Sequence, residues 1–188
     1  MFCCLLKLLL YKNHLLEKIK YQFQDNAPQI VVITHSSNVC GAVAPIKEIF
    51  DLAKNYDAIT ITDMAQTAGL IKTSLSEVKS DFTVFAGHKT LYGPMGVGGF
   101  IMDNSIKLTP LLYGGTGVDS ANQDLPETLP ERFEVGSPNV SAIAGLNAAL
   151  QWIEETSIAE ILKKENENKN KLHQLLKKYD NIKTFIPS

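Results

Sequence analysis

The sequence predicts an α/β domain built on a mainly parallel sheet. Short β-branched runs alternate with amphipathic helical patterns, and glycine, proline or polar residues separate them. A strand, a helix and a second strand in that order favour parallel pairing through a right-handed crossover. The 188 residues suit one domain.

The first half of the chain carries the repeating pattern. A helix is predicted over 13–22, and residues 25–28 end it. Residues 29–34 are expected to form a strand buried on both faces, because the run is apolar and β-branched. Proline begins a helix over 45–56 with one apolar stripe, and a second strand follows at 58–62.

The second half is less regular. Residues 81–85 and 99–102 are predicted strands, and 111–134 is an extended segment too long for an idle connection. A helix is predicted over 140–155, with Asn139 or Ser141 as its cap. A further helix reaches about residue 178, and a last strand is predicted over 182–186.

Composition excludes several classes of protein. With 45% hydrophobic and 20% charged residues, the chain is neither disordered nor fibrous, and a net charge of −2 gives no pull towards nucleic acid or anionic membrane. Cys3 and Cys4 are adjacent and Cys40 is distant, so neither a metal site nor a disulfide framework is expected. We therefore expect a reducing, cytoplasmic compartment.

The opening residues are apolar. Lys7 interrupts the run, which is shorter than the roughly 20 residues of a spanning helix. No basic region or small-residue cleavage site marks a signal peptide. A buried strand or helix segment is expected, and a remnant of something longer is the alternative.

Polar residues follow three predicted strands, at 35–38, 63–66 and 87–89. Ligands of parallel α/β sheets collect beyond the carboxyl ends of the strands, so these clusters are expected to converge on one pocket. Polar residues are also common in loops by chance, and that alternative stays open at this point.

Lys89 stands before a glycine-rich loop at 93–99, which Pro94 stiffens. The glycines allow unusual backbone angles and close approach of the main chain to a ligand. A lysine held on such a turn can be desolvated, which lowers its pKa and lets its amine form a Schiff base. The alternative is a surface lysine beside a flexible loop.

Four motifs in order resemble the pyridoxal-phosphate enzymes of the class V aminotransferase and cysteine desulfurase family. They are Ser-Asn-Val-Cys-Gly at 37–41, Asp-Met-Ala-Gln at 63–66, Gly-His-Lys-Thr-Leu-Tyr-Gly-Pro-Met-Gly at 87–96 and Arg-Phe-Glu-Val-Gly-Ser-Pro-Asn at 132–139. The resemblance runs from about Leu15 to the C-terminus.

The resemblance implies fold type I, a three-layer sandwich with a mainly parallel sheet. Residues 1–14 would be an apolar leader outside the resemblance, and 15–155 the central part of the cofactor-binding large domain. Residues 156–188 would then be a linking helix and the first strand of a truncated small domain.

The resemblance also implies roles for single residues toward pyridoxal 5'-phosphate. Lys89 matches the lysine that holds the cofactor and moves protons at the substrate α-carbon. Asp63 matches the carboxylate that pairs with the pyridine nitrogen, and Gln66 and Asn38 match residues beside the phenolic oxygen. A structural alternative for Asp63 is that it caps a turn.

Two further residues match phosphate ligands. His88 resembles the family histidine beside the lysine, and Ser137 a hydroxyl residue that reaches the cofactor of the other subunit, which implies a homodimer. As alternatives, His88 is a structural histidine and Ser137 caps the helix that begins near Pro138. Ala86 replaces a frequent serine or threonine, so one phosphate hydroxyl is missing.

The implied function is that of a cysteine desulfurase, which converts L-cysteine to L-alanine and transfers sulfur to an enzyme cysteine. Family members are about twice as long, and their nucleophilic cysteine and substrate-binding arginine have no convincing counterpart here. Cys40 is either a nucleophile beside the pocket or a small buried hydrophobe.

Three alternatives remain open at this stage. The chain could catalyse another class V aminotransferase or lyase reaction, or be an inactive fragment that serves as an interaction module. It could also need a complement that supplies the missing halves. No nucleic-acid or membrane partner is expected.

Overall fold

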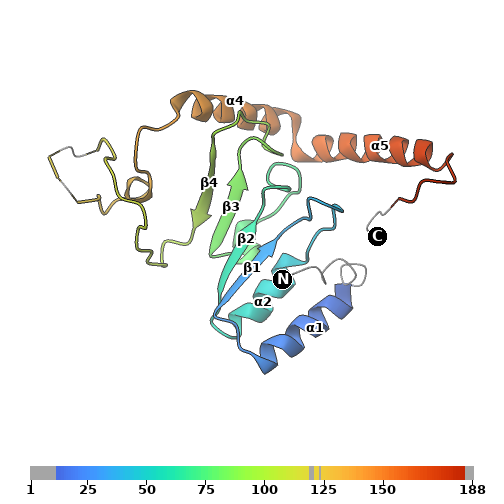
Figure 1. Ribbon diagram of the computed structural model, residues 1–188, viewed down its shortest axis with the longest axis horizontal. Helices are drawn as coiled ribbons and strands as arrows, with labels where there is room; N and C mark the ends of the chain where they lie inside the picture. The colour runs from blue at the N-terminus through green and yellow to red at the C-terminus, as the bar shows by residue number, and fades with distance from the viewer. Residues whose placement is uncertain (1–11, 119–120, 123, 185–188) are drawn as a thin grey trace.

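A computed structural model of the protein describes residues 12–118, 121–122 and 124–184 (Figure 1). The sheet has the strand order β1-β2-β3-β4; the first three strands are parallel and β4 is antiparallel to β3. This confirms the predicted mainly parallel sheet. The strands are β1 (Ile30–Thr34), β2 (Ile59–Asp63), β3 (Phe82–Ala86) and β4 (Gly98–Met102).

Three helices belong to the first half of the chain: α1 (Lys12–Asp25), α2 (Ile46–Lys54) and the short α3 (Leu75–Val78). Figure 1 shows α1 and α2 on the same side of the sheet. The predicted stripe of α2 is buried, and Phe50 and Ala53 are fully enclosed. Because α3 has four residues, no helical period could reveal it in the sequence.

The opposite face of the sheet is open, which corrects the expectation for the first strand. In β1, Val31 is buried against α2, but Ile30 is 58% and Val32 is 62% exposed. No helix among the described residues covers that face, so the described chain has two of the three expected layers. A run of β-branched residues indicates a strand, but the number of covered faces depends on distant segments.

Two long helices end the described chain. Helix α4 (Val140–Thr156) begins at Asn139, whose side chain accepts a hydrogen bond from the Ala142 N–H, and α5 (Ile158–Leu176) follows after Ser157. In Figure 1, α4 crosses the end of the sheet where β3 terminates.

Some expectations fall at the margins of the described residues. Residues 1–11, most of the expected apolar leader, lie outside them, and 12–14 begin α1. Of the predicted last strand, 182–184 are not in a strand and 185–186 are not described. The expected irregular segment contains one 3-10 turn, η1 (Glu131–Phe133). Across the described ranges, no helix has the length and hydropathy to cross a membrane.

Candidate functional site

The three polar segments follow strands that end at one edge of the sheet. Beyond the strand ends, the His35 N–H donates to the Asp63 carbonyl oxygen at 2.9 Å, and the Met64 N–H to the Val84 carbonyl oxygen at 2.8 Å. These hydrogen bonds fix the turn after β2 between the segment that follows β1 and the strand β3. The edge is the position at which parallel α/β sheets bind ligands.

Asp63 is half-buried at the end of β2. Its Oδ1 accepts a hydrogen bond from the Ala65 N–H at 2.9 Å, so the carboxylate does stabilise a turn. Within the described ranges Oδ2 has no partner, and neither does the half-buried amide of Gln66. One carboxylate oxygen and one amide therefore remain available to a ligand.

His35 ties the first polar segment to the second. It is buried, and its Nδ1 lies 2.9 Å from the Oγ1 of Thr67, which is fully buried in the turn after Gln66. Burial lowers the pKa of His35, so the imidazole is neutral at pH 7. Sequence reasoning named the segment that contains His35 but missed this pairing, since nothing in the sequence links the two residues.

The segment that contains Asn38 folds on itself. The Ser37 Oγ accepts hydrogen bonds from the Val39 and Cys40 N–H groups at 3.2 and 3.3 Å, and Asn38 is exposed. Cys40 is half-exposed, so it is not a fully buried hydrophobe. A side-chain hydrogen bond with Ser37 lowers the pKa of the Cys40 thiol.

The loop that carries Lys89 is closed by its own backbone. The Gly93 N–H donates to the Gly87 carbonyl oxygen at 2.8 Å, and the Tyr92 N–H to the Lys89 carbonyl oxygen at 3.0 Å. A Cβ at position 93 would lie 2.8 Å from that Gly87 oxygen. Gly93 thus permits close packing of the chain on itself, whereas Gly96 has a positive φ of 87°.

Helix α4 supports this loop from one side. Leu91 and Leu146 are buried in a common apolar cluster, and Tyr92 packs edge-on against Trp152 with ring centroids 5.2 Å apart. A Cβ on Gly145 would lie 2.8 Å from the Cγ of Pro94, so the helix backbone lies directly on the loop. The side chains and the backbone of α4 therefore hold this loop in place.

His88 and Lys89 themselves are exposed. The described residues therefore hold the backbone of Lys89 in place, but they do not bury its amine as the sequence-based hypothesis of a desolvated lysine requires. The adjacent Thr90 hydroxyl is buried and has no hydrogen-bond partner in the described part of the chain.

Ser137 lies in the segment before α4 and is exposed. Asn139 caps the helix, so the capping alternative for Ser137 does not hold. The amide of Asn139 lies against Gly96, since a Cβ on that glycine would approach the Asn139 Nδ2 to 3.0 Å. Ser137 is thus two residues from a side chain that lies on the glycine-rich loop, although no hydrogen bond or ion pair within the described ranges joins Ser137 to the residues at the strand ends.

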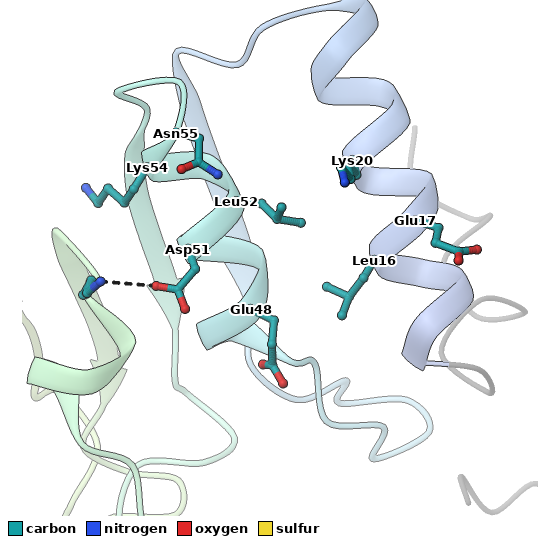
Figure 2. A pocket seen from close by; sticks show the side chains of 9 residues that line it. Leu16, Glu17, Lys20, Glu48, Asp51, Leu52, Lys54 and Asn55 are labelled. Carbon is teal, nitrogen blue, oxygen red and sulfur yellow. Dashed lines mark hydrogen bonds and ion pairs between the residues drawn. The ribbon is translucent and has the colours of Figure 1, made fainter.

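A separate groove lies between α1 and α2 (Figure 2). Leu16 and Leu52 face each other across it, and the dashed line in Figure 2 joins Asp51 to Lys79 at 3.4 Å. Its lining contains none of the residues at the strand ends. The groove is therefore distinct from the candidate site.

The free polar groups fit pyridoxal phosphate. An available Asp63 oxygen suits a protonated ring nitrogen, the Gln66 amide suits a ring oxygen, and the Lys89 amine on its rigid loop suits an aldehyde. The arrangement offers a carboxylate, an amide and a primary amine at one sheet edge.

Comparison with known proteins gives consistent matches. A sequence model of the family "Aminotransferase class-V" matches residues 7–188. The chain is 30% identical over 165 residues to a "Probable cysteine desulfurase" of Methanothermobacter thermautotrophicus, covering 86% of this chain and 41% of the relative. A protein of the same description from Halalkalibacterium halodurans is 36% identical over 143 residues, covering 74% of this chain and 35% of that relative.

Solved structures share the fold. An apo cysteine desulfurase from Thermococcus onnurineus NA1 matches with a TM-score of 0.76 at 28% identity, over 94% of this chain and 45% of that one. A NifS-like protein from Rickettsia africae matches with a TM-score of 0.71 at 26% identity, over 93% and 46%. The chain thus spans less than half the length of these relatives.

Proposed function

The chain belongs to the aminotransferase class-V family of pyridoxal-phosphate-dependent enzymes, and on that premise we propose that its strand-end residues hold pyridoxal phosphate. The observation that carries the proposal is that the segments 63–66 and 87–89 come at the ends of the neighbouring parallel strands β2 and β3, on one edge of the sheet, with an available carboxylate oxygen and amine. A shared fold alone would not support a function, but a matching set of groups does.

Each residue has a proposed role. Asp63 Oδ2 accepts a hydrogen bond from the pyridine nitrogen and keeps that nitrogen protonated, and Gln66 and Asn38 donate to the ring's phenolic oxygen. Lys89 presents its amine to the aldehyde and later carries a proton to or from the substrate α-carbon. When bound, the cofactor supplies an electron sink for that carbon.

Two residues are proposed as phosphate ligands. His88 holds the phosphate of the same subunit's cofactor, and Ser137 reaches that of a second copy in a homodimer. The absence of Ser137 from the cap of α4 supports this role, since its hydroxyl is not committed to the helix. The exposure of both side chains supports it as well.

The proposed reaction is that of a cysteine desulfurase, the conversion of L-cysteine to L-alanine with transfer of sulfur to an enzyme cysteine. The similarity of the chain to probable and structurally solved cysteine desulfurases supports it. We propose that the nucleophilic cysteine and the arginine for the substrate carboxylate come from outside these 188 residues, so the chain alone gives no turnover. The cysteine pattern supports a cytoplasmic location.

Reductive trapping tests the cofactor site. The chain is incubated with pyridoxal phosphate and borohydride, and the modified peptide is identified by mass spectrometry. We expect one adduct on Lys89, which Lys89→Ala abolishes and Lys72→Ala, a change of another exposed lysine, leaves in place. Equal labelling of exposed lysines, or an adduct that persists in Lys89→Ala, would contradict the proposal.

The second candidate function is an interaction module that binds no cofactor. The exposure of His88 and Lys89 and the open sheet face favour it. The same trapping experiment separates the two functions, because a module without a cofactor site gives no selective adduct.

A further inference from the structure

The turn that follows β2 is tightly folded around Thr67. This turn, residues 64–71, comes directly after Asp63 and contains Gln66. The Thr67 N–H donates to the Met64 carbonyl oxygen at 3.0 Å, and two later N–H groups of the turn donate to the Thr67 carbonyl oxygen. The backbone of Thr67 is therefore used within the turn, and only its side chain is left to bind another segment.

The Thr67 side chain joins the turn to the segment after β1. Its Oγ1 lies 2.9 Å from the His35 Nδ1; Thr67 is fully buried and His35 is 5% exposed. A buried polar group without a partner is costly, so the pair resists separation. His35 is itself fixed, because its N–H donates to the Asp63 carbonyl oxygen and its carbonyl oxygen accepts from the Ala44 N–H at 2.8 Å.

The other end of the turn 64–71 packs on the loop that carries Lys89. Gly69 has a positive φ of 78°, and a Cβ at this position would lie 2.9 Å from the Thr90 carbonyl oxygen and 2.9 Å from the Leu91 Cδ2. Thr90 follows Lys89 directly, so the position of the turn is linked to that of the lysine. A shift of the turn would therefore change the distance between its polar side chains and the amine.

From these contacts we propose that the hydrogen-bonded pair His35–Thr67 positions Asp63 and Gln66 for the cofactor. The pair connects to the backbone of both proposed ligands, since the His35 N–H binds the Asp63 carbonyl oxygen and Thr67 follows Gln66 directly. Groups that bind a ligand must be held within about 0.5 Å of the productive geometry, and this pair supplies that constraint. His35 and Thr67 are thus positioning residues.

This inference rests on the proposed function, because it explains how two of the proposed ligands are held. The probe is pyridoxamine 5'-phosphate, which has the ring and the phosphate of the cofactor but an amine in place of the aldehyde. Its binding therefore needs no bond to Lys89, and isothermal titration calorimetry measures its Kd. Reductive trapping on Lys89 of the wild type reports on the proposed function separately.

Two substitutions at position 67 separate the hydroxyl from the volume of the side chain. Thr67→Val has nearly the same volume but removes the hydrogen bond, and we expect it to weaken binding of the probe about fivefold or more. Thr67→Ser keeps the hydroxyl and should restore binding to within about twofold of the wild type. His35→Gln places its amide where Nε2 lies and not Nδ1, so it should weaken binding as Thr67→Val does.

Asp81→Asn is the control for stability. Asp81 precedes β3, at the opposite end of that strand from Lys89, and it accepts hydrogen bonds from Lys54 and Thr60. The substitution should lower the unfolding free energy and leave the Kd of the probe unchanged. Circular dichroism at the assay temperature checks that each variant is folded.

A double-mutant cycle tests whether Thr67 acts through Asp63. In Asp63→Asn the remaining side-chain oxygen can still accept the hydrogen bond from the Ala65 N–H, so the turn is kept while the carboxylate charge is lost. Thr67→Val should therefore weaken binding by a smaller factor in Asp63→Asn than in the wild type. Full additivity of the two losses would contradict the proposal.

Three other outcomes would overturn it. The first is the same Kd for the wild type, Thr67→Val and His35→Gln. The second is a loss of binding in Asp81→Asn as large as that in Thr67→Val, which would leave the pair with a role in stability alone. The third is a wild type that is trapped on Lys89 but does not bind the probe; a wild type that is not trapped selectively refutes the proposed function itself.

Discussion

Replacing Gly93 by alanine should strain the loop that carries Lys89. The added methyl carbon would lie 2.8 Å from the Gly87 carbonyl oxygen and 2.9 Å from the Leu146 Cδ1. Ordinary contacts of a Cβ begin near 3.4 Å, and here one neighbour is the backbone of the same loop, so the turn between Gly87 and Gly93 must open and the Leu146 side chain on α4 must shift.

The expected magnitude combines two opposing effects. Overpacking of this kind costs about 1–3 kcal/mol of unfolding free energy, whereas replacing glycine stiffens the unfolded chain and returns about 0.4–1 kcal/mol. We therefore expect a net loss of about 1–2 kcal/mol. Urea unfolding monitored by circular dichroism measures it.

Gly115→Ala is the control, because a Cβ at position 115 meets no atom within 4 Å. Its unfolding free energy should equal that of the wild type or exceed it slightly. Equal stability of Gly93→Ala and Gly115→Ala would refute the inference that backbone packing, and not approach to a ligand, requires glycine at position 93.

Two further predictions concern pH. Burial lowers the pKa of His35 in the folded protein, so the imidazole takes up a proton at a higher pH in the unfolded chain than in the folded one. The unfolding free energy should therefore fall as pH drops below about 6.5, by at most about 1.4 kcal/mol per pH unit. Urea unfolding at pH 7.5 and 5.5 should show a smaller loss in His35→Gln, and an equal loss would exclude His35 as the cause. Burial alone would raise the pKa of Asp81, but hydrogen bonds from Lys54 and Thr60 outweigh it and lower that pKa. Asp81 thus stabilises the fold above its unfolded pKa of about 3.9, and that contribution is lost as pH falls through its lower folded pKa. Asp81→Asn should lower the unfolding free energy by about 1–3 kcal/mol at pH 7, and no loss would contradict a structural role for these hydrogen bonds.

The local elements could be predicted from the sequence because their signals are local. The stripe of α2, which includes Phe50 and Ala53, needs only the helical period, and a proline precedes that helix. Asn139, one of two candidate caps, does cap α4. The parallel pairing of β1 with β2 was predicted from the alternation of strand, helix and strand.

Features that depend on distant residues could not be predicted. The exposure of Val32 depends on which segments cover the sheet, and the pairing of His35 with Thr67 joins residues 32 positions apart. The sequence showed glycine at position 93 but not the Gly87 carbonyl oxygen against it. The candidate site residues were named through the family resemblance, and their roles stay predictions.

The open sheet face makes the solubility of the described fold depend on its concentration. An uncovered apolar surface on one copy associates with the same surface on another copy, so association rises with concentration. Dilute solutions would therefore keep the described fold in single copies, and concentrated solutions would lose it to aggregation.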